Sequence, residues 1–273
     1  MSGRWTKRLG SALALLCLTI LLCDWAVAAD PKIVAHRGAA LESPENTLPA
    51  IDRAIALGAA VVEIDLRYSA DGEVVLMHDE TVDRTTHGSG LVSRMTLAEI
   101  RKLDAGARSA AQFKGTKVPT LREVIDHSRG KIQLYLDLKE TDPDPVIHVV
   151  KEMKAGPMVF FRPYSYRAMR QVIDADPAFR VLVDLEDWIQ LPGLASLIRK
   201  DAPAASLSSG LRNWTPELLA EAKSLGFTTF VNVLGADDTA ENLRHAIAMG
   251  FDFIQTDHQS ELKELIGSAS SRR

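Results

Sequence analysis

The stretch that decides the fold is residues 61–67, which read Val-Val-Glu-Ile-Asp-Leu-Arg. Its β-branched and apolar residues predict a buried strand, and the two-residue period of a strand directs Glu63 and Asp65 to the same side. A helical pattern at 47–57 precedes this strand. Such an order is typical of the α/β fold class, in which parallel strands alternate with helices.

The same alternation of strand and helix continues through the chain. Nine candidate strands lie at 32–36, 61–67, 73–78, 132–138, 158–162, 180–185, 205–209, 228–234 and 251–256, and helical patterns separate most of them. A (β/α)₈ barrel has eight strands. The run at 205–209, Ala-Ser-Leu-Ser-Ser, is the least apolar, so we assign the other eight to the barrel. A doubly wound open sheet is the alternative, but no glycine-rich dinucleotide loop follows the first strand.

The length of the chain, 273 residues, fits one barrel domain at 29–273. Its composition, 46% hydrophobic and 25% charged, is that of a globular protein and excludes a disordered or fibrous chain. The stretch at about 80–118 interrupts the alternation after the third candidate strand. We interpret it as an insertion at the C-terminal end of a barrel strand, where barrel enzymes build their active sites.

Residues 1–28 have the order of a secretory signal peptide. A positively charged start is followed by an apolar run at 9–23 and then by the small-x-small pattern Ala26-Val27-Ala28. The apolar run is too short to span a bilayer comfortably, which disfavours the alternative of a retained membrane anchor. We therefore expect an exported protein, either periplasmic or secreted.

Both cysteines, Cys17 and Cys23, lie inside this segment, and each follows a leucine, which argues against a lipoprotein signal. The mature chain is then predicted to contain no disulfide, so its folding must rely on the core. Loss of the segment changes the formal net charge from −4 to −6, because it removes three basic residues and one acidic residue. No basic tract suggests binding to nucleic acid or to a membrane surface. No feature of the sequence specifies an oligomeric state.

Polar side chains stand in or at the ends of the first four candidate strands. They occur in His36-Arg37-Gly38, Glu63-Ile64-Asp65, His78-Asp79 and Asp137-Leu138-Lys139. The C-terminal ends of the strands in a parallel barrel open on one face, so we expect these side chains to converge there.

Glu63, Asp65 and Asp137 form a candidate metal site. Three carboxylates without thiolates suit one hard divalent cation, Mg²⁺ or Ca²⁺, better than zinc. The alternative is a buried ion network in which the three acids pair with Arg37 and Lys139, because buried carboxylates need compensating positive charge.

Two pairs of basic residues complete the candidate site. Arg37 and Lys139 are natural phosphate partners, since one presents a planar fork of donors and the other a point charge. His36 and His78 are candidates to flank a reacting group as base and acid. A lone histidine at a strand end is more often structural, but two beside a carboxylate cluster favour catalysis.

These motifs, in this order, resemble those of the glycerophosphodiester phosphodiesterase family. The matching segments are His36-Arg37-Gly38, Pro44-Glu45-Asn46-Thr47, Glu63-x-Asp65, His78-Asp79, Asp83-Arg84-Thr85-Thr86-x-Gly88-x-Gly90, Leu103-Asp104-Ala105-Gly106, Val118-Pro119-Thr120-Leu121 and Ile254-x-Thr256-Asp257. The resemblance is dense over residues 31–140 and thin beyond them. The joint order of these segments, rather than any single motif, makes the resemblance specific.

The resemblance implies a metal-dependent barrel hydrolase that releases glycerol 3-phosphate from an alcohol. It implies that a neighbouring glycerol hydroxyl attacks the phosphorus and that water opens the resulting cyclic phosphate, with His36 as base and His78 as acid. The other roles it implies are metal binding by Glu63, Asp65 and Asp137, phosphate binding by Arg37 and Lys139, and support from Glu45, which would hold Arg37, and from Asn46.

The chain departs from the pattern of the family at three places. Asp137 stands where the family usually has Glu, so its carboxylate is one methylene shorter and changes either its contact with the metal or the position of the metal. Val231-Asn232-Val233 replaces a Trp-containing run, and Gln259 replaces a proline, which affects substrate selection more than catalysis. Two other functions stay open: a lipid-directed phosphodiesterase on the same barrel, and a non-catalytic exported protein that binds a phosphorylated polyol. A small soluble glycerophosphodiester is favoured because aromatic residues make up only 6% of the chain.

Overall fold

Eight parallel strands close into a barrel in the computed structural model of the protein, which describes residues 29–140, 142–185 and 204–271. Around the ring the strands follow the order β1 (Lys32–Ala35), β2 (Val61–Tyr68), β4 (Gln133–Leu138), β5 (Val159–Arg162), β6 (Arg180–Asp184), β7 (Ala205–Gly210), β8 (Thr228–Asn232) and β9 (Phe253–Thr256). Strand β1 pairs with both β2 and β9, which closes the ring. The predicted (β/α)₈ barrel is therefore confirmed. The predicted signal peptide at 1–28 lies outside the described residues, and so does one of the helical patterns that separate the candidate strands, at 192–200.

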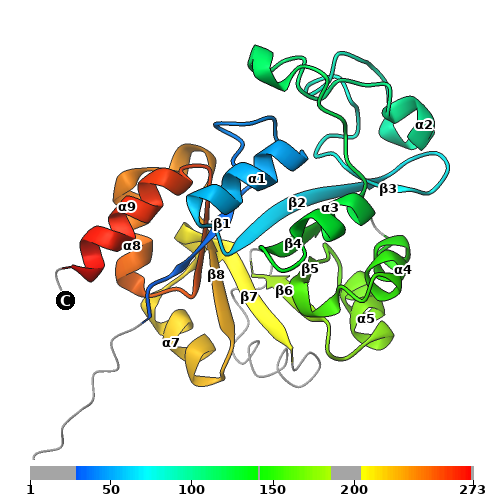
Figure 1. Ribbon diagram of the computed structural model, residues 1–273. Coiled ribbons are helices and arrows are strands. Elements are labelled where there is room, and N and C mark those ends of the chain that lie inside the picture. Colours follow the sequence, from blue (N-terminus) through cyan, green and yellow to red (C-terminus); the bar gives the residue numbers. More distant parts are fainter. Residues whose placement is uncertain (1–28, 141, 186–203, 272–273) are drawn as a thin grey trace, which may run out of the picture.

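Helices cover the outside of the ring (Figure 1). They are α1 (Leu48–Leu57), α3 (Leu121–Ser128), α4 (Asp144–Glu152), α5 (Tyr166–Ala175), α7 (Pro216–Ser224), α8 (Ala240–Met249) and α9 (Gln259–Ser270), with short 3₁₀ turns at η3 (Gly156–Met158), η4 (Leu211–Asn213) and η5 (Gly235–Asp237). Most begin at a Thr or Ser whose side chain accepts a hydrogen bond from the first turn, as Thr47 and Thr239 do. None of the described helices is long and apolar enough to cross a membrane.

Apolar side chains fill the interior of the barrel. A cluster of buried residues from seven of its strands packs there: Val34, Val61, Tyr135, Phe160, Leu182, Phe230 and Phe253. The rings of Phe230 and Phe253 stack with 4.3 Å between their centroids. On β2 and β4 the charged residues come two and four positions after these apolar ones. Because side chains alternate along a strand, the charged groups lie on the same inner face, nearer to the C-terminal ends of the strands.

The assignment of residues 73–78 to the barrel is wrong. Strand β3 (Val74–Leu76) pairs antiparallel with β2 and lies outside the ring. Strand β2 runs beyond the barrel to Tyr68, and β3 returns along it until the backbone N–H of Met77 donates to the carbonyl oxygen of Asp65, 3.0 Å away. His78 therefore reaches the C-terminal face by a hairpin rather than at the end of a parallel strand.

The exclusion of 205–209 from the barrel is also wrong, because β7 occupies the place between β6 and β8. Its side chains are polar yet buried: Ser206 is 4% exposed, and Ser208 and Ser209 are 0% exposed. The serines are small enough to be buried in a barrel strand, although they lack the apolar pattern by which buried strands are recognised.

The insertion at 80–118 extends from the β2–β3 hairpin at one side of the barrel (Figure 1). It contains η1 (Val92–Arg94), the single turn α2 (Leu97–Ile100) and η2 (Ala111–Phe113). A second hydrophobic cluster, here called the satellite cluster, packs inside it against β3 and consists of Val75, Met77, Val82, Val92, Ile100, Leu103, Ala105 and Val118. The insertion thus has a small core of its own.

Candidate functional site

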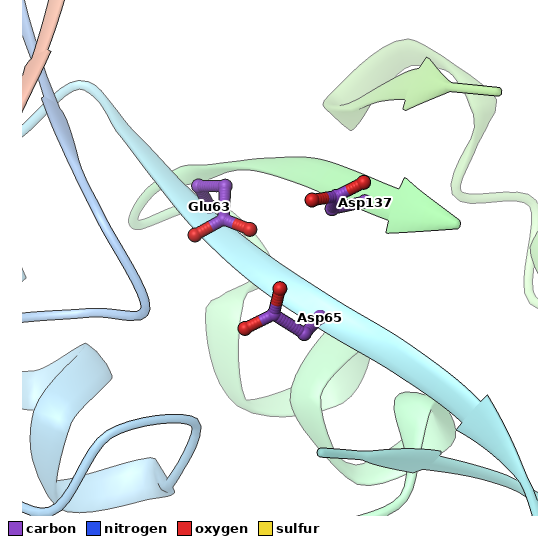
Figure 2. A group of neighbouring side chains, drawn as sticks. All are labelled: Glu63, Asp65 and Asp137. Carbon is purple, nitrogen blue, oxygen red and sulfur yellow. The ribbon is translucent and has the colours of Figure 1, made fainter. Parts of the chain in front are cut away.

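Three buried carboxylates meet at the C-terminal end of β2 and β4. Glu63 and Asp65 come from β2, and Asp137 lies directly beside Asp65 in the register of β4. The three residues are only 2%, 1% and 7% exposed. Ligand atoms from all three lie within 4.8 Å of one another, and Figure 2 shows the side chains gathered over the two strands. The three residues that the sequence predicted as metal ligands are thus brought together.

Neighbouring positive groups compensate the charge of Asp65 more than that of Glu63, and the pKa values of the two carboxylates shift in opposite directions. Burial raises the pKa of Glu63 well above its usual range, and the neighbouring Asp65 and Asp137 raise it further. Burial alone would also raise the pKa of Asp65, but Lys139, a hydrogen bond from Asn46 and Arg37 lower it overall. A divalent cation would relieve the repulsion that Glu63 experiences, and three carboxylate oxygens are donors that a hard cation prefers. The residues present therefore fit such a cation.

Lys139 stands between two of the carboxylates. Its Nζ lies 3.0 Å from Oδ1 of Asp65 and 2.7 Å from Oδ2 of Asp137. Although burial opposes the charged form, these two carboxylates raise the pKa of Lys139 above its usual range. Nε of Arg37 lies 3.6 Å from Oδ2 of Asp65. The ion network considered from the sequence is thus present in part, and Glu63 has no ion pair in it among the described contacts.

Two further residues at this end of the barrel were missed by sequence reasoning. Arg162, the last residue of β5, donates to Asp137 across 3.3 Å and also bonds to Asp184. The hydroxyl of Tyr164 donates to Oδ2 of Asp137 across 3.0 Å, and its ring centroid lies 4.2 Å from the guanidinium carbon of Arg162. The sequence signal that could have identified Arg162 is its position. Arg162 is a basic residue at the C-terminal end of β5, just as Lys139 directly follows the C-terminal end of β4. Together these residues anchor the short side chain of Asp137.

The loop between β1 and α1 wraps the carboxylates. Asn46 donates to Oδ2 of Asp65 across 2.6 Å and accepts from the backbone N–H of Asp65 across 3.0 Å. The backbone N–H of Arg37 donates to Glu63 across 2.8 Å. Arg37 and Asn46 both have left-handed backbone, with φ of 52° and 56°. The two residues predicted from the sequence for phosphate binding and support are therefore held in unusual conformations beside the acids.

Gly38 explains how this loop turns so close to the barrel. Its φ is 83°, and a Cβ there would come within 2.6 Å of the Cβ of Ala50 in α1. Only glycine fits such a close approach without displacing the helix. The loop then places Glu45, which accepts from Nη1 of Arg37 across 3.1 Å, as the resemblance led us to expect.

His36 is held by Asp257, the residue that directly follows the last strand of the barrel, β9. Its Nδ1 lies 2.8 Å from Oδ1 of Asp257, and its Nε2 accepts from Nε of Arg37 across 3.2 Å. Burial alone would raise the pKa of Asp257, but the hydrogen bond and the charge of His36 lower it. The backbone N–H of Asp257 donates in turn to Asp238 across 2.7 Å. The sequence marked Asp257 as part of a motif but gave no indication of this partnership.

His78 has a carboxylate partner of a different kind. Its Nδ1 lies 2.7 Å from Oδ1 of its neighbour Asp79, and Asp79 is also bound by Arg84 from the insertion. The backbone N–H of Met77, the residue before His78, donates to the carbonyl oxygen of Asp65 across 3.0 Å, so the backbone brings His78 next to the carboxylate-bearing part of β2. The nine residues predicted for the site all lie at or beside the C-terminal ends of β1, β2 and β4.

Comparisons with known proteins converge on one group. The model of the glycerophosphoryl diester phosphodiesterase family matches residues 36–222. A glycerophosphodiester phosphodiesterase from Caldanaerobacter subterraneus subsp. tengcongensis is 33% identical over 86% of this chain and 97% of its own. The crystal structure of a glycerophosphodiester phosphodiesterase from Agrobacterium tumefaciens superposes with a TM-score of 0.77 at 32% identity, covering 86% of this chain and 99% of that one.

A further solved structure shares the fold. It is an Oleispira antarctica phosphodiesterase in complex with the product sn-glycerol-3-phosphate, 24% identical, with a TM-score of 0.74 over 87% of this chain and 97% of that one.

Proposed function

Because the chain belongs to the glycerophosphoryl diester phosphodiesterase family, we propose that it hydrolyses glycerophosphodiesters to an alcohol and glycerol 3-phosphate by histidine acid/base catalysis, with one divalent cation, Mg²⁺ or Ca²⁺. The enzyme class, glycerophosphodiester phosphodiesterase, follows from the relative that is 33% identical over most of both chains. The finer proposal rests on one observation. Three buried carboxylates meet beside basic side chains and two carboxylate-bound histidines at the end of the barrel where such enzymes build their sites.

The acidic residues of the site would bind the cation, and the basic residues bind the phosphate group of the substrate. Glu63, Asp65 and Asp137 would hold the cation, which when bound offsets negative charge on the phosphoryl oxygens. Arg37 and Lys139 flank the carboxylates and bind the phosphate group. Their contacts with Asp65 and Asp137 keep both side chains at the site before substrate arrives, which reduces the ordering that binding would otherwise require.

The histidines move protons. A donor at Nδ1 of His36, directed to Asp257, makes Nε2 the accepting nitrogen. Nε of Arg37 donates to Nε2 across 3.2 Å, so Arg37 must turn to the phosphate group before Nε2 takes a proton, and the carboxylate of Asp257 then stabilises the imidazolium that forms. We assign His36 as the base that deprotonates the neighbouring hydroxyl of the glycerol. That oxygen attacks the phosphorus, His78 protonates the departing alkoxide, and water then opens the cyclic phosphate.

A lipid-directed phosphodiesterase is the second candidate, and one observation favours it. Among the described residues, the large hydrophobic side chains that are most exposed are Leu41, Tyr164 and Tyr166, with 61%, 58% and 55% of their surface accessible. All three follow the C-terminal ends of β1 or β5, so they stand on the face that carries the site. An apolar rim of this kind would contact the acyl chain of a lysophospholipid.

One assay distinguishes these functions. The purified protein is given glycerophosphocholine, glycerophosphoethanolamine, glycerophosphoglycerol and a lysophospholipid, each with chelator and then with added Mg²⁺ or Ca²⁺. We expect release of glycerol 3-phosphate from the water-soluble diesters. Faster turnover of the lysophospholipid would favour the lipid-directed enzyme. Binding of the diesters without turnover under every metal condition would leave the phosphopolyol-binding protein as the explanation.

A further inference from the structure

Arg84 binds two carboxylates at once. Its Nη1 and Nη2 donate to the two oxygens of Glu45 across 2.7 and 2.8 Å. Its Nε and Nη2 donate to the two oxygens of Asp79 across 2.7 and 3.0 Å. Both contacts are therefore bidentate, a geometry that a guanidinium group can form and an ammonium group cannot.

Each of these carboxylates has a second partner in the candidate site. Glu45 accepts from Arg37 across 3.1 Å, and Asp79 bonds to Nδ1 of His78 across 2.7 Å. The contacts form one continuous chain that runs from Arg37 through Glu45, Arg84 and Asp79 to His78. Arg84 is the central member of this chain and the one that lies within the insertion.

The insertion fixes the backbone on either side of Arg84. Val82 and Thr86 are both 0% exposed, and Val82 belongs to the satellite cluster. The backbone N–H of Thr86 donates to the carbonyl oxygen of Val82, 3.0 Å away, and that of Val82 donates to Gly90, 3.0 Å away. The position of Arg84 is therefore set by the fold of the insertion and not only by its two carboxylate partners.

We propose that Arg84 is a positioning residue that aligns the phosphate-binding Arg37 and the acid His78 with each other across the site. The proposal rests on the proposed function and deepens it, because it gives the insertion a role in the reaction. Without Arg84, the carboxylates of Glu45 and Asp79 each lose a bidentate partner and gain rotational freedom. The guanidinium of Arg37 and the imidazole of His78 would then lose the orientation in which they act together on one phosphodiester.

A merely structural ion pair would behave differently. The side chain of Arg84 is 46% exposed, and an ion pair at such a position adds little to stability. Arg84→Met is therefore expected to lower kcat by about 10–100-fold and to lower Tm by at most about 4 °C. Arg84→Lys keeps the charge but cannot bridge both carboxylates, so we expect it to recover only part of the lost kcat.

Arg101→Met is the matched control. Arg101 lies in the same insertion and ties it to α3 through Glu123, and its Nη1 donates across 3.0 Å to the carbonyl oxygen of Val118 at the end of the insertion. If the insertion needs only general anchoring, the two Met variants will lose kcat equally, and that result overturns the proposal. A loss confined to Arg84→Met supports it. In a His78→Ala background the proposal predicts that Arg84→Met lowers kcat by a smaller factor, because Arg84 can then act only through Glu45 on Arg37.

A second readout does not depend on turnover. In protein labelled with ¹⁵N-histidine, the proposal predicts that His78 carries its neutral-state proton at Nδ1, and that Arg84→Met, but not Arg101→Met, mixes the two tautomers. If the wild-type protein cleaves no glycerophosphodiester, the proposed function fails while this measurement still decides the role of Arg84. An unchanged His78 spectrum together with wild-type kcat in Arg84→Met would overturn it.

Discussion

The imidazole of His36 lies against the carboxylate of Asp257, with 2.8 Å between Nδ1 and Oδ1, although 221 positions separate them in the sequence. Closure of the barrel creates this contact, because β1 pairs with β9 and Ala35 stands beside Thr256 in the register. The first and last strands of the ring thus build one half of the acid/base machinery together.

Replacement of Asp257 by Asn tests this relationship. The amide cannot stabilise a protonated imidazole, and it permits the wrong tautomer of His36, so we expect kcat to fall by about 10–100-fold. KM and metal content should change little, since Asp257 does not contact the carboxylates of the candidate metal site in the described structure. Steady-state kinetics with metal analysis on the same preparation checks this, and an unaltered kcat would exclude a role for the pair.

The histidines themselves should affect the rate rather than binding. His36→Ala and His78→Ala are each expected to lower kcat by roughly 10²–10⁴-fold, the usual contribution of a positioned acid or base. Substrate affinity should be nearly retained because Arg37 and Lys139 remain. Thermal unfolding of both variants provides the control. Near-wild-type turnover by a folded His36→Ala protein would refute the mechanism.

Chelation should abolish activity, and Mg²⁺ or Ca²⁺ should restore it. Glu63→Ala removes the one acid of the three that has no ion pair among the described contacts, so we expect loss of both bound metal and activity. Metal titration by calorimetry on wild-type and variant protein measures the first effect. Normal turnover after exhaustive chelation would show that the three carboxylates are a structural network.

The stability contributed by Glu45 should depend on pH. Burial alone would raise its pKa, but the hydrogen bond from Arg84 and the charge of Arg37 lower it below the usual 4.5. A lowered pKa in the folded protein means that the stabilisation is fully present above 4.5 and is lost as pH falls through the folded value. The difference in unfolding free energy between wild-type and Glu45→Gln protein should therefore shrink below pH 4.5. A difference that is independent of pH would contradict this assignment.

We also propose that residues 1–28 direct export and are removed. Mass spectrometry of the exported protein should then show a start near Ala29 or Asp30. A membrane-embedded product that retains Met1 would contradict the proposal.

The alternation of strands and helices was enough to predict the barrel and most of its boundaries. It failed at 73–78 and at 205–209 for related reasons. In the apolar run around Val75, Val75 and Met77 are buried in the satellite cluster, whereas Val74 and Leu76 are buried in the main hydrophobic core. Apolar periodicity reports burial without indicating whether a strand belongs to the ring. Ser208 shows the converse, since a fully buried barrel position can be polar.

Contacts in the candidate site between residues near in sequence could be predicted, and contacts between residues far apart in sequence could not. Glu63 and Asp65 share one strand face, so their proximity follows from the period of the strand alone. The partnership of Asp257 with His36 depends on ring closure, and the anchoring of Asp137 by Arg162 depends on the register between β4 and β5. Neither relationship leaves a trace in local sequence spacing.

The separate core of the insertion has a consequence for how the protein loses function on heating. A segment with its own small hydrophobic cluster, joined to the ring through a hairpin, can open as a local unit while the barrel stays folded. Such opening would release Arg84 and, through Asp79, the acid His78. Activity should therefore decline at a lower temperature than the one at which the barrel melts, and amide hydrogens of the insertion should exchange with solvent before those of β4 and β5.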